Sequence, residues 1–266
     1  MNRIDKKFKE LKERGKKAFI VYITVGDPSL KMTERLVLEL ERSGVDIIEL
    51  GVPFSDPLAD GPTIQNAALR ALKKGVTMAD AMRLVRSIRK RSGIPIAFMT
   101  YYNPVLQYGL KRFARDCKAF GVDGVIVPDL PYEEADELRK YSKQAGMSMV
   151  YLLAPTSTPA RIQAIGKAST GFVYYVSVTG VTGARKKMPK ELVAALRKIR
   201  SKVNKPLCVG FGVSQPRQAR QIARAADGVI VGSALISLIE KSSKNDELVK
   251  KVSGFAKRLA TTVHSV

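Results

Sequence analysis

One segment of the chain, from Asp46 to Gln65, contains two carboxylates in a setting that suits acid–base chemistry. Glu49 interrupts a short apolar run that is typical of a strand buried on both faces. Asp60 follows in a stiff loop rich in proline and aspartate. Burying a lone carboxylate is costly and raises its pKa, so such a residue is either paired locally or used. A barrel enzyme can place an acid–base pair at the mouth of the barrel by using one carboxylate on a strand and a second on the loop that follows it.

The same two residues also admit a purely structural interpretation. Glu49 could be a buried residue bonded to backbone, and Asp60 could cap the helix expected to start near Pro62. The chain has a single histidine, His264, third from the C-terminus and expected to be frayed. A Ser-His-Asp triad, a zinc site or a histidine base is therefore not expected, and acid–base work falls to carboxylates, tyrosine or lysine.

The composition bounds the class of protein. The 266 residues and 45% hydrophobic content fit one large α/β barrel or two ordinary domains. No apolar run reaches membrane-spanning length, and the charged N-terminal residues lack a signal region. We therefore expect a cytoplasmic protein that does not associate with a membrane. Cys117 and Cys208, the two cysteines, are expected to be small core residues.

The formal net charge of +22 is large for a chain of this length. It raises the possibility of nucleic-acid binding. The basic residues, however, are spread along many segments, mostly on the polar faces of expected helices, and no nucleic-acid motif is present. We therefore expect a solvated basic exterior and no nucleic-acid partner, with an acidic partner surface as the remaining alternative.

The pattern of elements alternates between strand and helix throughout. A short extra helix around Ile4, Phe8 and Leu11 is expected first. Eight strands are expected, each followed by helical sequence, at 18–24, 46–52, 95–100, 124–127, 147–153, 171–176, 207–210 and 228–231. Length and unit count predict a (β/α)8 TIM barrel, and the lack of a linker predicts a single domain over residues 1–266. An open doubly wound sheet is the alternative.

The loops after the strands are where such a barrel places its function. Glycines follow both the seventh strand, at Gly210 and Gly212, and the eighth, at Gly232 before Ser233. Bare backbone amides and a helix N-terminus there predict a phosphate site. The loop 177–188 combines glycines, small hydroxyl residues and a basic run, and suits a mobile lid. The residues thus indicate an enzyme acting on a small phosphorylated substrate, with no metal and no organic cofactor.

Several motifs resemble one family. The run ELGVPFSDPLADGPTIQ at 49–65 resembles the signature of the tryptophan synthase α subunit. The resemblance extends over nearly the whole chain, through MTYYNP at 99–104, VPDLP at 127–131, SVTGVTG at 177–183 and GFGVS at 210–214. It implies a barrel that splits indole-3-glycerol phosphate into indole and glyceraldehyde 3-phosphate. It also implies an α2β2 complex, in which indole passes to a β subunit that carries pyridoxal phosphate and joins indole to serine.

The resemblance also implies roles for individual residues. Glu49 and Asp60 match the two catalytic carboxylates of the family. Further matches are the phosphate-binding residues Gly183, Gly212, Gly232 and Ser233, the substrate-pocket residues Tyr22, Ile64, Tyr101, Tyr174 and Thr182, and the partner-interface residues Pro53, Asp56 and Pro131. Thr182 is expected to pair with Asp60 when the lid closes. Where this chain has Tyr22 the family often has Phe, so its hydroxyl needs a partner that the sequence does not reveal.

Two rival functions are considered. Another sugar-phosphate barrel, such as indole-3-glycerol-phosphate synthase or phosphoribosylanthranilate isomerase, would share the phosphate glycines but lack the Glu49 and Asp60 pattern. The synthase also needs a catalytic lysine on a strand, and no expected strand contains one. A basic, non-catalytic binding subunit is the second rival. The charge of +22 departs from the near-neutral or acidic family and puts the strength of partner binding in question.

Overall fold

Parallel strands form the centre of the molecule, which we describe from a computed structural model covering residues 1–176, 190–210, 212–242 and 245–266. All neighbouring strands run parallel, in the order β5-β4-β3-β2-β1-β9-β8-β7-β6. The strands are β1 (Ala18–Thr24), β2 (Ile47–Gly51), β3 (Ile96–Met99), β4 (Gly124–Ile126), β5 (Ser148–Val150), β6 (Leu152–Leu153), β7 (Val173–Val176), β8 (Leu207–Gly210) and β9 (Gly228–Val231).

The two ends of this pairing order are joined by the chain itself. β5 and β6 are parts of one run, interrupted at Tyr151, where the sequence predicts a single strand over 147–153. Because β5 pairs with β4 and β6 pairs with β7, the run links both ends of the sheet and the sheet forms a nearly closed barrel. The predicted (β/α)8 barrel is confirmed, and the open-sheet alternative is wrong.

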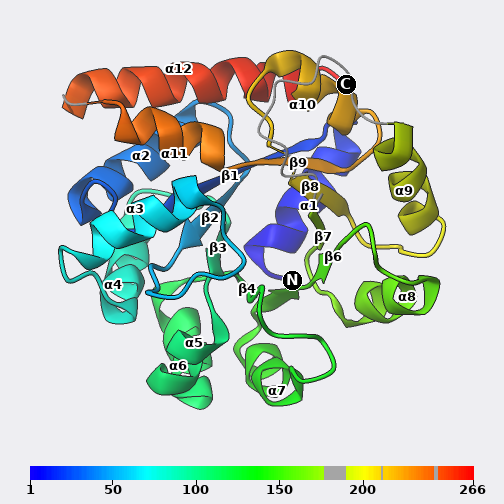
Figure 1. Cartoon of the computed structure of the whole chain (residues 1–266), viewed down its shortest axis with the longest axis horizontal. Coiled ribbons are helices and arrows are strands. Elements are labelled where there is room, and N and C mark those ends of the chain that lie inside the picture. The colour runs from blue at the N-terminus through cyan, green and yellow to red at the C-terminus, as the bar shows by residue number, and fades with distance from the viewer. Residues whose placement is uncertain (177–189, 211, 243–244) are drawn as a thin grey trace.

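Helices surround the strands (Figure 1). They are α1 (Arg3–Glu13), α2 (Leu30–Arg42), α3 (Pro62–Leu72), α4 (Met78–Arg89), α5 (Tyr102–Tyr108), α6 (Leu110–Phe120), α7 (Asp136–Ala145), α8 (Pro159–Ala168), α9 (Lys190–Arg200), α10 (Pro216–Ala223), α11 (Ser233–Glu240) and α12 (Asn245–His264). The predicted extra helix is α1. Its buried side chains, Ile4, Phe8 and Leu11, pack with those that fill the barrel, so α1 closes one end.

Three local features differ from what the sequence suggests. Helix α5 was not predicted because Asn103-Pro104 suggests a loop, yet proline is tolerated in the first turn of a helix, where its missing N–H is not needed. Helix α7 begins only at Asp136, five residues after Pro131, because turn hydrogen bonds to the carbonyl groups of Pro131 and Tyr132 occupy the preceding residues. His264 is not frayed, since it lies at the end of α12 with Nε2 2.8 Å from Asp46 Oδ2.

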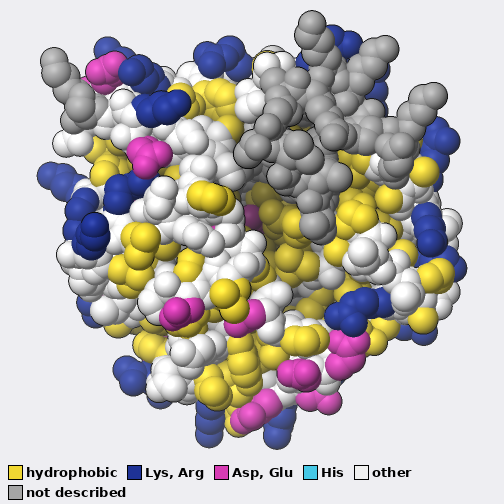
Figure 2. Space-filling model, viewed as in Figure 1, with side chains coloured by type: hydrophobic (Ala, Val, Ile, Leu, Met, Phe, Trp, Pro, Cys, Tyr) yellow, Lys and Arg dark blue, Asp and Glu magenta, His cyan; other side chains and the backbone are white. Residues whose placement is uncertain are grey.

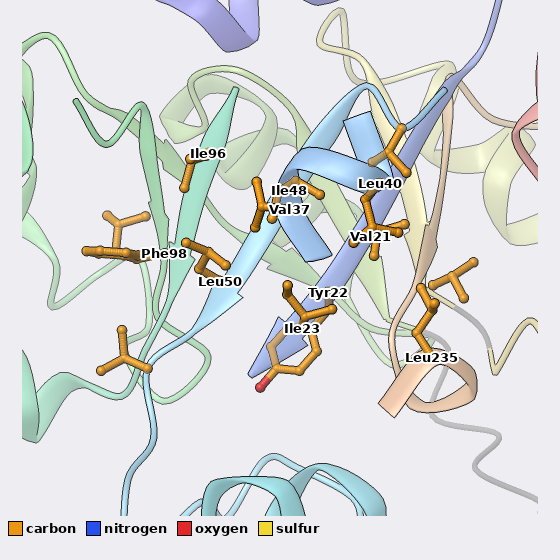
Figure 3. Packing of buried hydrophobic residues seen from close by; sticks show 14 of the residues in the cluster. Val21, Tyr22, Ile23, Val37, Leu40, Ile48, Leu50, Ile96, Phe98 and Leu235 are labelled. Atoms are coloured by element: carbon orange, nitrogen blue, oxygen red, sulfur yellow. The ribbon is translucent and has the colours of Figure 1, made fainter. Parts of the chain in front are cut away.

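Alternation along the strands creates two apolar layers. Inward side chains such as Ile20 and Ile47 fill the barrel, and outward ones pack beneath the helices. Figure 3 shows part of the outer layer, in which strand residues Val21 and Ile48 lie with Val37 and Leu40 of α2. The strict period of two puts Glu49 on the inward face, in the same orientation as Ile47.

Candidate active site

Glu49 lies on the inner face of β2, near the end of that strand from which the Asp60 loop leaves. The register places it opposite Tyr22 of β1 on one side and Ala97 of β3 on the other. Its exposed fraction is 0%. Because alternate residues of a strand face the same way, β2 positions Glu49 toward the barrel interior.

Neither carboxyl oxygen of Glu49 has a hydrogen-bond partner among the described residues. The interpretation of Glu49 as a residue bonded to backbone is therefore not supported. Burial raises the pKa of Glu49 from its ordinary value of 4.5 to about 8. At neutral pH this carboxyl is mostly protonated, and it can donate a proton to a bound molecule.

Asp60 is held at the loop after β2 by a tyrosine. The hydroxyl of Tyr101 donates to Asp60 Oδ2 at 3.0 Å and accepts from the backbone N–H of Ala59, also at 3.0 Å. Burial raises the pKa of Asp60, and the Tyr101 hydrogen bond opposes that rise. The capping interpretation is wrong, because the N-cap of α3 is Gly61 and the helix has no side-chain cap hydrogen bond.

Tyr22 and Tyr174 occupy the interior beside these carboxylates. The Tyr22 hydroxyl lies 3.4 Å from Thr24 Oγ1, which supplies the partner that the sequence did not reveal. Both rings require a nearby glycine: a Cβ at Gly51 would lie 2.0 Å from the Tyr22 hydroxyl, and one at Gly210 would lie 2.6 Å from the Tyr174 hydroxyl. These glycines let the rings cross the barrel at the carboxyl ends of the strands.

The ionisable groups of the site influence one another. Burial is the largest cause of the raised pKa of Tyr22 and of Tyr174, and negative charge on Asp60 and Glu49 raises both further. The structure thus brings Glu49, Asp60, Tyr22, Tyr101 and Tyr174 together. Figure 2 shows a hollow near the centre of the molecular face, bordered by hydrophobic side chains.

The predicted phosphate residues lie after two adjacent strands. β8 pairs with β9, so the loops that follow them start side by side. Gly212 follows β8 with a φ of +37°, a backbone conformation that favours glycine. Gly232 is the N-cap of α11, and Ser233 is its first residue and is exposed. Thr182, Gly183 and the predicted lid lie outside the described residues.

Comparisons with known proteins identify the family. A model of the family described as tryptophan synthase alpha chain matches residues 8–264. The chain belongs to the tryptophan synthase alpha chain family. It is 50% identical to the tryptophan synthase alpha chain of Citrifermentans bemidjiense over 97% of each chain, and 49% identical to that of Geotalea uraniireducens over 100% of this chain and 99% of the other.

Solved structures agree with this assignment to the tryptophan synthase alpha chain family. The alpha subunit from Legionella pneumophila superposes with a TM-score of 0.92 at 38% identity, covering 100% of each chain. A ligand-free tryptophan synthase from M. tuberculosis gives a TM-score of 0.89 at 36% identity over 99% of each chain. The resemblance stated from the motifs is therefore confirmed. The rival synthase also needs a strand lysine, and none of the nine described strands contains one.

A leucine that the sequence analysis missed stands out in the Asp60 loop of this tryptophan synthase alpha chain. The side chain of Leu58 is 92% exposed, although the loop around it is ordered by the bonds from Tyr101 and by Leu58 N–H donating to Asp56 C=O at 2.9 Å. Nearby Asp56 is exposed, whereas Pro53 is buried. A leucine within a loop of prolines and aspartates, at 53–62, is a signal that could have been read from the sequence.

A salt-bridge network that the sequence did not reveal connects helices α3 and α11. Arg70 of α3 donates to both carboxylate oxygens of buried Asp27, at 2.9 and 2.8 Å, and to Glu240 of α11 at 2.7 Å. Helix α3 carries the Asp60 loop, and α11 begins at the predicted phosphate residues. Arg70 therefore ties the C-terminal ends of α3 and α11 to the loop after β1. Its partners lie 43 and 170 positions away, beyond any local sequence signal.

The described residues include no cluster of three or more histidine, cysteine, aspartate or glutamate side chains that could bind a metal ion. Within the same part of the chain, no helix is long and apolar enough to cross a membrane. Cys117 and Cys208 are buried free thiols, as expected for core residues.

Proposed function

We propose that Glu49 and Asp60 are the catalytic pair of the tryptophan synthase alpha reaction in this chain. That reaction is the retro-aldol cleavage of indole-3-glycerol phosphate to indole and D-glyceraldehyde 3-phosphate, so the chain is a lyase of tryptophan biosynthesis. The observation that carries the assignment is the buried, unpartnered Glu49 carboxyl, with a pKa of about 8, near a carboxylate anchored by Tyr101.

Glu49 acts first as an acid and then as a base. Indole is a poor carbanion leaving group, so the protonated Glu49 carboxyl donates its proton to ring carbon C3 and makes an electron-accepting indolenine. The resulting Glu49 carboxylate then removes the proton of the adjacent glycerol hydroxyl. As the C–C bond breaks, its electron pair restores the indole ring and the hydroxyl oxygen becomes the aldehyde carbonyl. The proton taken up by Glu49 restores the starting acid.

Asp60 stabilises the charge that develops during this step. Protonation at C3 places positive charge on the ring nitrogen, and a carboxylate that accepts the indole N–H offsets it. The bond from Tyr101 keeps Asp60 oriented and favours its ionised form, against the rise in pKa that burial causes. The two carboxyl groups thus take opposite roles because their surroundings differ.

The remaining predicted residues position the substrate. Gly212, Gly232 and Ser233, with Gly183, bind the phosphate through backbone amides and the N-terminus of α11. Ile64, Tyr22 and Tyr174 form the walls of the indole pocket. Thr182 pairs with Asp60 when the loop 177–188 closes. Phosphate binding far from the reacting bond supplies binding energy that orients the indole ring.

The partner is a tryptophan synthase β subunit in an α2β2 complex, to which indole is passed. Asp56 and Pro131 contact it, and the exposed Leu58 extends that surface, whereas the buried Pro53 offers little surface to a partner. Pyridoxal phosphate belongs to the β subunit, and this subunit needs neither a metal nor an organic cofactor. Residues 1–266 act as one cytoplasmic domain. Docking orders the catalytic loops, so the isolated chain turns over slowly.

Indole release from indole-3-glycerol phosphate tests the proposal, with and without a β subunit. Glu49→Gln and Asp60→Asn should each lower kcat by a factor of about 100 or more, because each removes a group that acts in the transition state. Glu137→Gln, an exposed carboxylate on α7, is the matched control and should leave kcat unchanged. Wild-type turnover retained by folded Glu49→Gln would overturn the assignment.

A further inference from the structure

A basic groove lies at the end of the barrel opposite the active site. It has a volume of about 900 Å³ and runs between α1 and the amino ends of the strands. Lys17 directly precedes β1, and Asp227 directly precedes β9, so the groove borders the edge where these strands begin. We call it the amino-end groove. Its cationic lining residues are Lys9, Lys12, Lys16, Lys17, Arg200 and Lys205.

Positive charge is concentrated in the amino-end groove beyond the general basicity of the chain. Six of its 15 lining residues are lysine or arginine, compared with 46 of 266 residues in the whole chain. Only two lining residues, Asp5 and Asp227, carry carboxylates. The groove therefore carries an excess of four positive charges. A cleft lined by one sign of charge concentrates its field and attracts ions of the opposite sign.

Internal pairing leaves half of these cations without an ion-pair partner. Asp227 forms a salt bridge with Arg200, lies 3.9 Å from Lys17 Nζ, and accepts the backbone N–H of Leu207 at 2.9 Å. Lys9 lies 3.9 Å from Glu13, and both side chains are about two-thirds exposed. Lys12, Lys16 and Lys205 have no salt bridge among the described residues. These three ammonium groups are available to an external anion.

The apolar side of the groove strengthens this electrostatic attraction. Phe8, Leu11 and Val203 line it and are 5–8% exposed, so they belong to the packed interior. Charges next to such a low-dielectric wall are screened less than charges surrounded by water.

The turn after α1 fixes the direction of the chain at Lys16, because Lys16 N–H donates to Leu11 C=O at 2.8 Å and Gly15 has a φ of +64°.

We propose that the amino-end groove binds a small anion that carries several phosphate groups, at a site separate from the catalytic phosphate site. The available cations are all lysines, which act as compact point charges suited to closely spaced phosphates. The arginine fork pairs with carboxylates and phosphates alike, and the single arginine in the groove is already paired with Asp227. Three unpaired ammonium groups around one groove complement a compact anion with several charges, and a polyphosphate carries such charges on adjacent groups.

Isothermal titration calorimetry with inorganic tripolyphosphate tests the proposal, using the full chain at low salt. Glycerol 3-phosphate at saturating concentration occupies the catalytic phosphate site during the titration. The test variant is the triple substitution Lys12→Gln, Lys16→Gln and Lys205→Gln. The matched control removes the same charge from exposed lysines elsewhere, through Lys140→Gln, Lys143→Gln and Lys250→Gln.

The expected result is one site per chain in wild type and control, with Kd weakened about tenfold or more in the groove variant. Equal weakening in both variants would mean that only the overall surface charge attracts the anion, and would overturn the proposal. Binding that is seen without glycerol 3-phosphate and lost in its presence would place the anion in the catalytic site and would also overturn the proposal. Tighter binding of a glutamate peptide with the same charge would reassign the groove to an acidic protein partner.

Indole release measured in parallel should be the same in all three proteins, so failure of the groove proposal leaves the catalytic assignment untouched.

Discussion

At the scale of single residues, the pKa of Glu49 links catalysis to stability. Burial raises it from 4.5 to about 8, so between these values the folded state retains a proton that the unfolded state has lost. The contribution of Glu49 to the free energy of unfolding should therefore be highest below about pH 4.5. It should fall as the pH rises through the window and level off above about pH 8.

Urea unfolding of wild type and Glu49→Gln at several pH values measures this contribution. The amide of the variant does not titrate. The free energy of unfolding of the variant, relative to that of wild type, should therefore rise by on the order of 3–5 kcal/mol between acidic and alkaline pH. Other carboxylates affect both proteins alike and cancel in the difference. A constant difference between the two proteins across the pH range would contradict a raised pKa at this position.

Some residues of the site could be predicted from the sequence and others could not. Glu49 is detectable because a carboxylate within an apolar strand is costly, and its inward orientation follows from the period of two. The partner of the Tyr22 hydroxyl, Thr24, lies two positions along the same strand and could have been inferred by the same rule. The bond from Tyr101 to Asp60 depends on the path of two loops, and only the folded structure reveals it.

At the scale of elements, Arg70 connects α3, α11 and the loop after β1. Asp27 is 2% exposed, and removing Arg70 would leave its carboxylate buried without its cation. We expect Arg70→Met to lower the free energy of unfolding by about 3 kcal/mol. Because α3 and α11 follow the two loops that we propose to hold the substrate, KM for indole-3-glycerol phosphate should also rise.

Arg70→Lys and Arg35→Met provide the comparison. Lysine restores one charged contact but not the paired bonds, so the variant should fall between wild type and Arg70→Met. Arg35 pairs with the exposed Asp246, and its loss should cost less than about 1 kcal/mol. Equal effects of Arg70→Met and Arg35→Met in urea unfolding would contradict the role given to Arg70.

The elements themselves were predictable where apolar periodicity was strong. The eight strand units follow from short apolar runs, each separated by an amphipathic helix. The interruption at Tyr151 and the helix α5 were missed, because closure of the barrel and a proline in a first helical turn are decided by tertiary context.

At the scale of the whole molecule, the partner surface can be tested through Leu58. A side chain that is 92% exposed gains about 2 kcal/mol when a partner covers it. Leu58→Asp should therefore weaken binding of the β subunit by at least a factor of about 30 in calorimetry, and should lower the stimulation of indole release. Leu69→Asp, at a leucine of α3 that is 47% exposed, is the control. Equal affinity of both variants would place Leu58 outside the interface.

The net charge of +22 is a property that the fold does not explain. The sequence predicted the family and the barrel because both depend on local motifs and repeated units. It did not predict that cations concentrate in a groove at the amino ends of the strands, because Lys12, Lys16 and Lys205 come together only when α1 packs against the barrel. Distribution of charge is therefore the part of this molecule that required the structure.

The most direct test of the account is an infrared titration of the Glu49 carboxyl, taken as the difference between wild type and Glu49→Gln. The signal of a protonated carboxyl should persist at neutral pH and disappear with a midpoint near pH 8. The rate of indole release should fall over the same range as the acid form is lost. A midpoint near 4.5 would mean that Glu49 is ionised at neutral pH, and would contradict its role as the acid that protonates indole.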